Sequence, residues 1–134
     1  MYIFELNTTK RQEMINITDV IERFILESKI KEGICTVFVP HTTAGVTINE
    51  NADPTVVDDI LNALDRIVPD IRFKHLEGNS DAHIKASLMG SSVNLIIEKG
   101  SLVLGTWQGI YFCEFDGPRK RKLYVSLNSV KASE

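Results

Sequence analysis

Three histidines, His41, His75 and His83, are the residues of this chain whose type and placement are best suited to chemistry. Each lies in a polar segment, and none lies on an apolar stripe. If the three segments meet, three imidazoles form an open metal site with one position left for water or substrate. The metal would act as a Lewis acid or supply hydroxide. The alternative is three unrelated, hydrogen-bonded histidines, because the chain has no H-x-H or H-E-x-x-H motif.

A second group of polar residues favours the binding of an anion such as phosphate. Hydroxyls, amides and a cation gather near expected helix N-termini, where free backbone N–H groups and the helix dipole attract negative charge. The same residue types are also ordinary turn and cap residues, so the pattern leaves both interpretations open. The candidates are Thr42, Thr43, Asn79, Ser80 and Lys85.

Glu50, Asn51 and Asp53 supply two carboxylates and an amide directly before an expected helix. Asp53 has a structural explanation as the helix N-cap, because Pro54 follows it at the first helical position. Glu50 has no such role. It could orient an imidazole through a hydrogen bond or act as a general base.

Three further candidates lie toward the C-terminus. Glu114 lies in an alternating strand among apolar neighbours. Burial would raise its pKa, unless the side chain faces solvent or pairs with an arginine. The basic run 119–122 is either a solvated hairpin tip or the source of an arginine, such as Arg121, that reaches a phosphate. Cys113 is more typical of a small core residue than of a nucleophile.

The elements that must position these residues are mostly strands. Period-two alternation, β-branched runs and proline boundaries predict the strands, and caps with apolar stripes predict the helices. The run 34–39 is nearly continuous in apolar and β-branched residues, which predicts a strand buried on both faces. Strands are expected at 1–8, 13–17, 34–39, 46–49, 93–98, 102–104, 108–115 and 122–127, and helices at 19–30, 54–67 and 80–89.

This order of elements favours an α+β fold with mostly antiparallel, sandwich-like sheets and two to three helices on one side. The 134 residues, 43% of them hydrophobic and 25% charged, fit a single globular domain spanning 1–134. Fifteen basic and eighteen acidic residues give a net charge of −3, which disfavours nucleic-acid or membrane-surface binding.

The expected location is the cytoplasm. No apolar run approaches the roughly 20 residues that span a bilayer, and the first residues do not form a signal peptide. The two cysteines, Cys35 and Cys113, are far apart, which is unlike a secreted disulfide scaffold.

Three motifs together resemble the signatures of the YjbQ-like family, also called the secondary thiamine-phosphate synthase family. The resemblance covers nearly the whole chain, and the combination is much more specific than any single motif. The segments that carry it are His41–Ala44, Thr47–Thr55, His75, Glu77–Gly78, Ala82–Gly90, Leu104–Tyr111 and Cys113–Glu114.

The resemblance implies a compact α+β fold built on a β-sandwich and assembled as a homotrimer. It implies a polar pocket that contains His41, His75 and His83, and it favours these residues as ligands of zinc, magnesium or manganese. It also implies a weak thiamine-phosphate synthase activity, in which a pyrimidine pyrophosphate and a thiazole phosphate give thiamine phosphate and pyrophosphate.

The first functional hypothesis is therefore an enzyme that acts on a small phosphorylated metabolite, with positive groups stabilising the departing phosphate. The alternatives are a metal-dependent hydrolase that uses the same pocket and a non-catalytic trimeric protein that binds a small anion or metal. Neither nucleic acid nor membrane is an expected partner. The expected site residues are His41, Glu50, Asp53, His75 and His83 for catalysis, and Thr42, Thr43, Asn51, Asn79, Lys85 and Arg121 for phosphate binding.

Overall fold

The computed structural model describes residues 1–130. Strands and helices occur close to the predicted positions, and the bounds differ by a few residues. The elements are β1 (Tyr2–Asn7), β2 (Glu13–Asn16), α1 (Thr18–Ser28), β3 (Gly33–Phe38), β4 (Ala44–Glu50), α2 (Pro54–Ile67), α3 (Ser80–Met89), β5 (Ser92–Glu98), β6 (Ser101–Leu102), β7 (Gln108–Glu114) and β8 (Lys120–Ser129).

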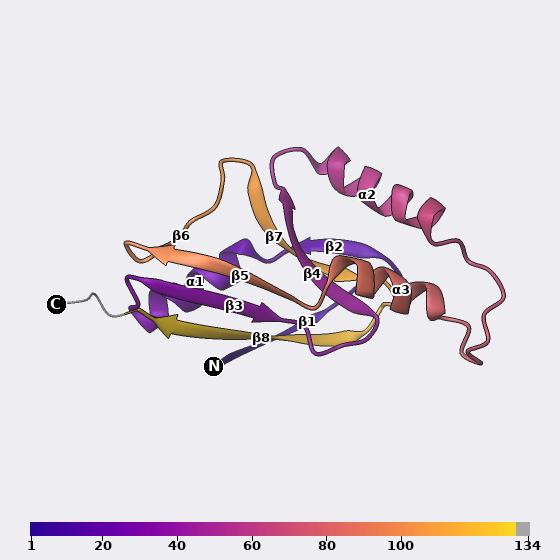
Figure 1. The fold of residues 1–134 in the computed structure, drawn as a ribbon, viewed down its shortest axis with the longest axis horizontal. Helices are drawn as coiled ribbons and strands as arrows, with labels where there is room; N and C mark the ends of the chain where they lie inside the picture. The colour runs from indigo at the N-terminus through magenta and orange to yellow at the C-terminus, as the bar shows by residue number, and fades with distance from the viewer. Residues whose placement is uncertain (131–134) are drawn as a thin grey trace.

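The strands form two antiparallel sheets, which confirms the predicted α+β class (Figure 1). One sheet has five strands in the order β1-β8-β3-β5-β6, and the other has three in the order β2-β7-β4. β7 is the central strand of the smaller sheet and pairs with both β2 and β4. The main core lies between the two sheets.

The alternation predicted for β7 divides its side chains between two cores. Ile110 and Phe112 point into the main core, toward the five-stranded sheet. Tyr111 and Cys113 point the other way, into a second core under α2 and α3. Both faces of this strand are therefore buried, and a shift of register by one residue would exchange the two sets.

Two of the three helices cover one side, as predicted. α2 and α3 pack on the outer face of the three-stranded sheet, where Leu64, Ala82 and Ala86 contact the second core (Figure 1). α1 does not pack on that face. Its residues Ile21 and Ile25 belong to the main core between the two sheets.

The helix starts explain two of the candidate polar residues. Asp53 caps α2 as predicted, since its Oδ1 accepts a hydrogen bond of 3.0 Å from the Thr55 N–H. α1 begins one residue earlier than expected. The Asn16 side chain accepts from the Thr18 N–H, and Asp19 lies within the first turn instead of capping the helix.

The prediction that β3 is buried on both faces is wrong. Its residues alternate, and Ile34 and Phe38 are each 38% exposed on the outer face of the five-stranded sheet. Ile3 and Ile96 are exposed on the same face, because β1, β8, β3 and β5 pair in register there. No element of residues 1–130 packs on this face, so these apolar side chains are exposed in the single chain.

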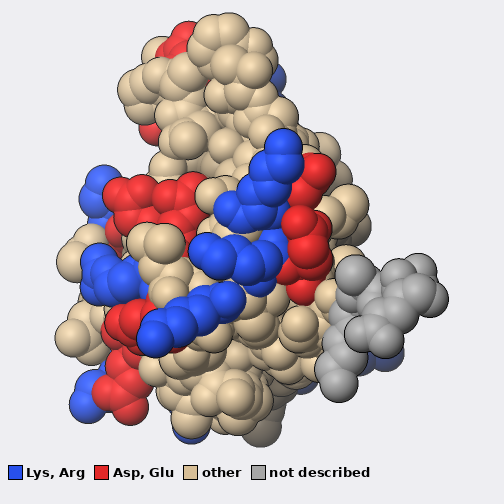
Figure 2. Space-filling view, turned by 90° about the vertical axis from the view of Figure 1, so that its left-hand side faces the viewer, with Lys and Arg blue, Asp and Glu red and all other residues tan. Residues whose placement is uncertain are grey.

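Charges of both signs are interspersed on the end of the molecule shown in Figure 2. Basic side chains lie next to one another across its middle, with acidic side chains on both sides. No helix within residues 1–130 combines the length and the apolar character needed to cross a membrane.

We expect Ile21→Ala to lower the free energy of unfolding by about 2–5 kcal/mol, because the side chain is fully buried between α1 and the main core. Leu26→Ala on the same helix is the control, since Leu26 is 71% exposed. Its effect should stay within about 0.5 kcal/mol. Urea denaturation measures both. Equal effects would contradict the placement of α1.

Candidate functional site

The structure brings all three histidines to one pocket of about 450 Å³, called the histidine pocket below. Four other predicted residues also line it, so this part of the candidate site converges although its segments lie far apart in the sequence. The lining residues are Pro40, His41, Thr42, Thr43, His75, Glu77, Asn79, His83, Asp116, Arg119 and Arg121.

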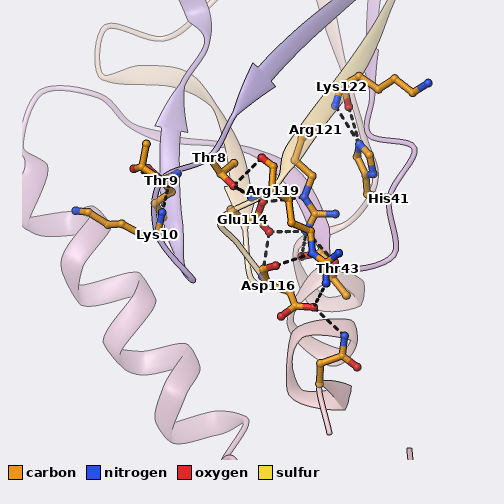
Figure 3. A network of polar contacts seen from close by, with 12 residues as sticks. Thr8, Thr9, Lys10, His41, Thr43, Glu114, Asp116, Arg119, Arg121 and Lys122 are labelled. Carbon is orange, nitrogen blue, oxygen red and sulfur yellow. Dashed lines mark hydrogen bonds and ion pairs between the residues drawn. The ribbon is translucent and has the colours of Figure 1, made fainter. Parts of the chain in front are cut away.

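Each histidine comes from a different segment. His41 lies between β3 and β4, His75 precedes α3, and His83 is in the first turns of α3. The rings of His75 and His83 meet edge to face, with centroids 5.7 Å apart. The Nε2 atom of His41 lies 3.0 Å from the backbone N and 3.1 Å from the carbonyl oxygen of Lys122 (Figure 3). Burial, followed by the nearby Arg121 charge, lowers the pKa of His41, which favours the neutral form of this ring.

The three rings do not form a preassembled metal site within residues 1–130. No three histidine, cysteine, aspartate or glutamate side chains in that range lie close enough to hold one ion. His41 is directed to the backbone of Lys122, whereas His75 and His83 pack against each other. The metal therefore stays a prediction.

Arg121, which lines the pocket, forms a buried ion pair with Glu114 (Figure 3). The two side chains are 0% and 5% exposed, respectively. Arg121 Nε donates to Glu114 Oε2 at 2.8 Å, and its Nη2 donates to Oε1. The carboxylate also accepts from the Thr8 hydroxyl and from the Asp116 N–H, at 2.8 and 2.9 Å. Both charges are thus satisfied by directed hydrogen bonds, as burial requires.

The sequence left a pairing of Glu114 with an arginine open, and the structure shows that pairing with Arg121. Burial by itself would raise the pKa. Hydrogen bonds from Arg121, the Asp116 N–H and Thr8 outweigh burial and lower it. Arg121 likewise lies inside the molecule and not at a solvated hairpin tip, since β8 begins at Lys120 and places Arg121 beside Glu114.

Arg121 connects this pair to the pocket wall. Its Nη2 donates to the Thr43 hydroxyl at 2.8 Å, on the segment that also carries His41. None of the hydrogen bonds found among residues 1–130 uses its Nη1 atom. Since Arg121 lines the pocket, its Nη1 group is left for a ligand.

A second polar chain borders the opening. Asn79 Nδ2 donates to Asp116 Oδ2 at 2.8 Å, and the half-exposed Arg119 contacts the same oxygen at 3.1 Å. Asn79 Oδ1 is buried and has no hydrogen-bond partner within residues 1–130. Asn79 also precedes α3 without capping it through its side chain.

Glu50, Asn51 and Asp53 do not join this site. The seven residues of β4 span about 20 Å, with the histidines near its start and Glu50 at its end. Asn51 Oδ1 accepts from Asn16, and Asp53 caps α2. Within one chain, this separation corrects the predicted catalytic or orienting roles of Glu50 and Asp53 and the predicted phosphate contact of Asn51.

Lys85 is also outside the pocket. It is buried, and its Nζ donates to Asp65 Oδ1 and Gln12 Oε1, both at 2.6 Å. It thereby ties α3 to α2 and to the segment before β2. Its charge is used for packing and not for phosphate.

Sequence reasoning missed Asp116 as a pocket residue and assigned no role to Arg119. The turn Asp116–Pro118, directly after Glu114, is the available signal, because such a turn returns the chain into β8. Nothing in the local sequence indicates that Asp116 would meet Asn79, since the contact joins residues 37 positions apart.

The model of the UPF0047 protein YjbQ-like family matches residues 2–129. A UPF0047 protein of Methanocaldococcus jannaschii is 56% identical over 128 residues, covering 95% of this chain and 93% of the relative. The UPF0047 protein YugU of Bacillus subtilis is 52% identical over 125 residues, covering 92% and 95%.

Solved structures share the fold. An uncharacterised YjbQ/UPF0047 protein of Clostridium acetobutylicum has a TM-score of 0.94 at 55% identity, covering 96% of this chain and all of that one. A protein of unknown function from Sulfolobus solfataricus has a TM-score of 0.92 at 34% identity and covers 96% of both.

We expect Glu114→Gln to lower the free energy of unfolding by about 3–5 kcal/mol, because it leaves the Arg121 charge buried without its partner. Glu98→Gln, at the exposed last residue of β5, is the control and should change stability by less than about 0.5 kcal/mol. Urea denaturation of both variants at neutral pH is the measurement.

The Glu114–Arg121 pair also makes the free energy of unfolding depend on pH. Because folding lowers the pKa of Glu114, its stabilisation is complete above the unfolded value of about 4.3 and is lost as the pH falls through the folded value. Wild type should therefore lose more stability on acidification than Glu114→Gln. Parallel losses of stability in the two proteins would contradict the assignment.

Proposed function

The chain belongs to the UPF0047 YjbQ-like family, and from this we propose that the histidine pocket binds and acts on the phosphate or pyrophosphate group of a small metabolite. One observation carries the proposal. Arg119, a buried Arg121 and three histidines line the same pocket.

The two arginines support an anionic ligand. A guanidinium offers planar, paired donors that match phosphate oxygens. Arg121 is held in place by Glu114 and Thr43, so little side-chain entropy remains to be lost on binding. The start of α3 borders the same pocket through Asn79, and its free backbone N–H groups favour negative charge.

The histidines support a chemical step and not binding alone. A neutral His41 can accept or share a proton at neutral pH. In the reaction implied by the family resemblance, the thiazole nitrogen bonds to the pyrimidine methylene carbon while the bond from that carbon to pyrophosphate breaks. The positive groups of the pocket would stabilise the departing pyrophosphate.

A divalent ion such as zinc, manganese or magnesium is a second proposal for this pocket. The edge-to-face pair of His75 and His83 favours it, because two neighbouring imidazoles could share one ion. A bound ion would supply additional positive charge beside Arg121. Metal-dependent hydrolysis is the activity that this version predicts.

We also propose self-association as a homotrimer. The exposed apolar side chains on the outer face of the five-stranded sheet support it, since association would bury them. They are Ile3, Ile34, Phe38 and Ile96.

The free thiols of Cys35 and Cys113 fit a cytoplasmic location.

We expect pyrophosphate to bind the wild-type protein and Arg119→Gln to weaken this binding by about tenfold, because one charge-assisted contact is lost. Isothermal titration calorimetry gives both dissociation constants. Arg66→Gln, on the exposed end of α2, removes the same charge away from the pocket and should bind as wild type does. Equal weakening by the two variants would indicate non-specific electrostatics.

Turnover separates an enzyme from a binding protein. With pyrimidine pyrophosphate and thiazole phosphate, wild type should release pyrophosphate, and His83→Asn should reduce the rate by about 100-fold or more if His83 acts in proton transfer or charge stabilisation. The control is Lys74→Asn, in the neighbouring loop outside the histidine pocket.

Binding without product, for these substrates and for simple phosphate esters, would favour the non-catalytic alternative. Loss of turnover after chelation, restored by zinc or manganese, would support the metal.

A further inference from the structure

Asp116 lies at the opening of the histidine pocket and contacts two groups that can bind an anion. Its Oδ2 accepts from Asn79 Nδ2 at 2.8 Å and from Arg119 Nη2 at 3.1 Å (Figure 3). Asn79 directly precedes α3, and Arg119 directly precedes β8. One carboxylate oxygen therefore joins an arginine of the pocket to the start of the helix.

Asp116 is itself held in place by the buried network behind it. Its backbone N–H donates to Glu114 Oε1 at 2.9 Å, and its side chain is 19% exposed. Burial alone would raise the pKa of Asp116, but hydrogen bonds from Asn79 and Arg119 outweigh burial and lower it. The carboxylate is therefore an ionised acceptor in a fixed position.

This carboxylate restrains the side chain of Arg119, which is 51% exposed. Arg119 Nε donates to the Asp116 carbonyl at 2.8 Å, so the main chain and the side chain of Asp116 hold the same guanidinium. None of the hydrogen bonds found among residues 1–130 uses Arg119 Nη1. Because Arg119 lines the pocket, this group can meet a ligand with little further loss of side-chain entropy.

The same carboxylate determines how Asn79 is used. An asparagine before a helix normally accepts a hydrogen bond from an N–H of the first turn. Asn79 makes no such bond, because its Nδ2 donates to Asp116, and its buried Oδ1 has no partner within residues 1–130. The first N–H groups of α3 have no acceptor inside the helix. They are therefore left for an anion in the pocket that Asn79 lines.

Stability alone does not explain this use of Asn79. A buried acceptor without a hydrogen bond lowers stability, and an Asn79 side chain that capped α3 would remove that cost. Departures of this kind from local rules are typical of functional sites. The contact with Asp116 thus exchanges a helix cap for a helix N-terminus that is free to bind.

We propose that Asp116 is the positioning residue of the anion site. It orders the Arg119 guanidinium and keeps Asn79 from capping α3, so that the arginine and the helix N–H groups bind one phosphate group together. Asp116 does not touch the ligand, since its charge repels an anion. This inference rests on the proposed function and adds the residue that arranges its binding groups.

Isothermal titration of pyrophosphate into the full chain separates positioning from charge. Removal of a carboxylate near the pocket should by itself strengthen anion binding, because a repulsive charge is lost. Asp116→Ala should instead weaken binding about tenfold, because two ordered sets of donors are lost. Asp116→Asn keeps an acceptor oxygen and should bind within about threefold of wild type.

Glu77→Ala is the matched control for charge. Glu77 also lines the pocket, is 69% exposed and contacts His75 instead of Arg119. It should bind pyrophosphate at least as tightly as wild type does.

A double-mutant cycle tests whether Asp116 acts through Arg119. Arg119→Gln should weaken pyrophosphate binding by about tenfold in wild type and by less than about twofold in Asp116→Ala, because the arginine is already disordered there. Thermal melting supplies a readout with the opposite sign. Asp116→Ala should melt no lower than wild type, since Asn79 becomes free to cap α3. Asp116→Ser repeats these measurements if Asp116→Ala does not fold.

The outcomes distinguish this inference from the proposed function. Unchanged or tighter binding by Asp116→Ala, or additive effects in the cycle, would overturn the positioning role and leave the anion pocket standing. Weaker binding together with a lower melting temperature would also overturn it, because the role would be structural. No binding of pyrophosphate to wild type would remove the proposed function together with this inference.

Discussion

The candidate site depends on the buried ion pair between Glu114 and Arg121. Glu114 comes from β7 in the smaller sheet, and Arg121 comes from β8 in the larger one. Thr8 and Thr43 complete the network from two further segments. A buried charge without these partners would strongly destabilise the fold. The hydrogen bonds that satisfy the pair therefore also hold the pocket wall in position.

β7 makes this arrangement possible because its two faces serve two cores. Phe112 anchors it to the main core, and Tyr111 and Cys113 anchor it to α2 and α3. The main core and the helices α2 and α3 are thus all packed against β7, the strand that carries Glu114. As a result α3, which bears His83, is placed against β4 and borders the histidine pocket.

Local patterns in the sequence predicted most elements, because periodicity and caps act over a few residues. Asp53–Pro54 correctly predicted the start of α2, and the alternation of β7 correctly divided its faces. From the sequence, a shared histidine site requires that three distant segments meet. The structure brings the three histidines to one pocket, but among residues 1–130 they do not form a three-ligand metal site.

The errors came from treating nearness in sequence as nearness in space. Glu50 follows His41 by nine residues, but an extended strand carries it to the opposite end of the sheet. Lys85 shares α3 with His83 and points to Asp65. Burial of Arg121 within a basic run depends on a partner from another strand, and no local pattern reports such a contact.

The most direct test of the central claim is a crystal structure of the protein with saturating pyrophosphate. The account predicts the anion in the histidine pocket, with oxygens within hydrogen-bond distance of Arg119 and of the Arg121 Nη1 group. The Glu114–Arg121 pair should remain intact. Pyrophosphate bound only elsewhere, or a pocket that stays without anion at saturation, would contradict the account.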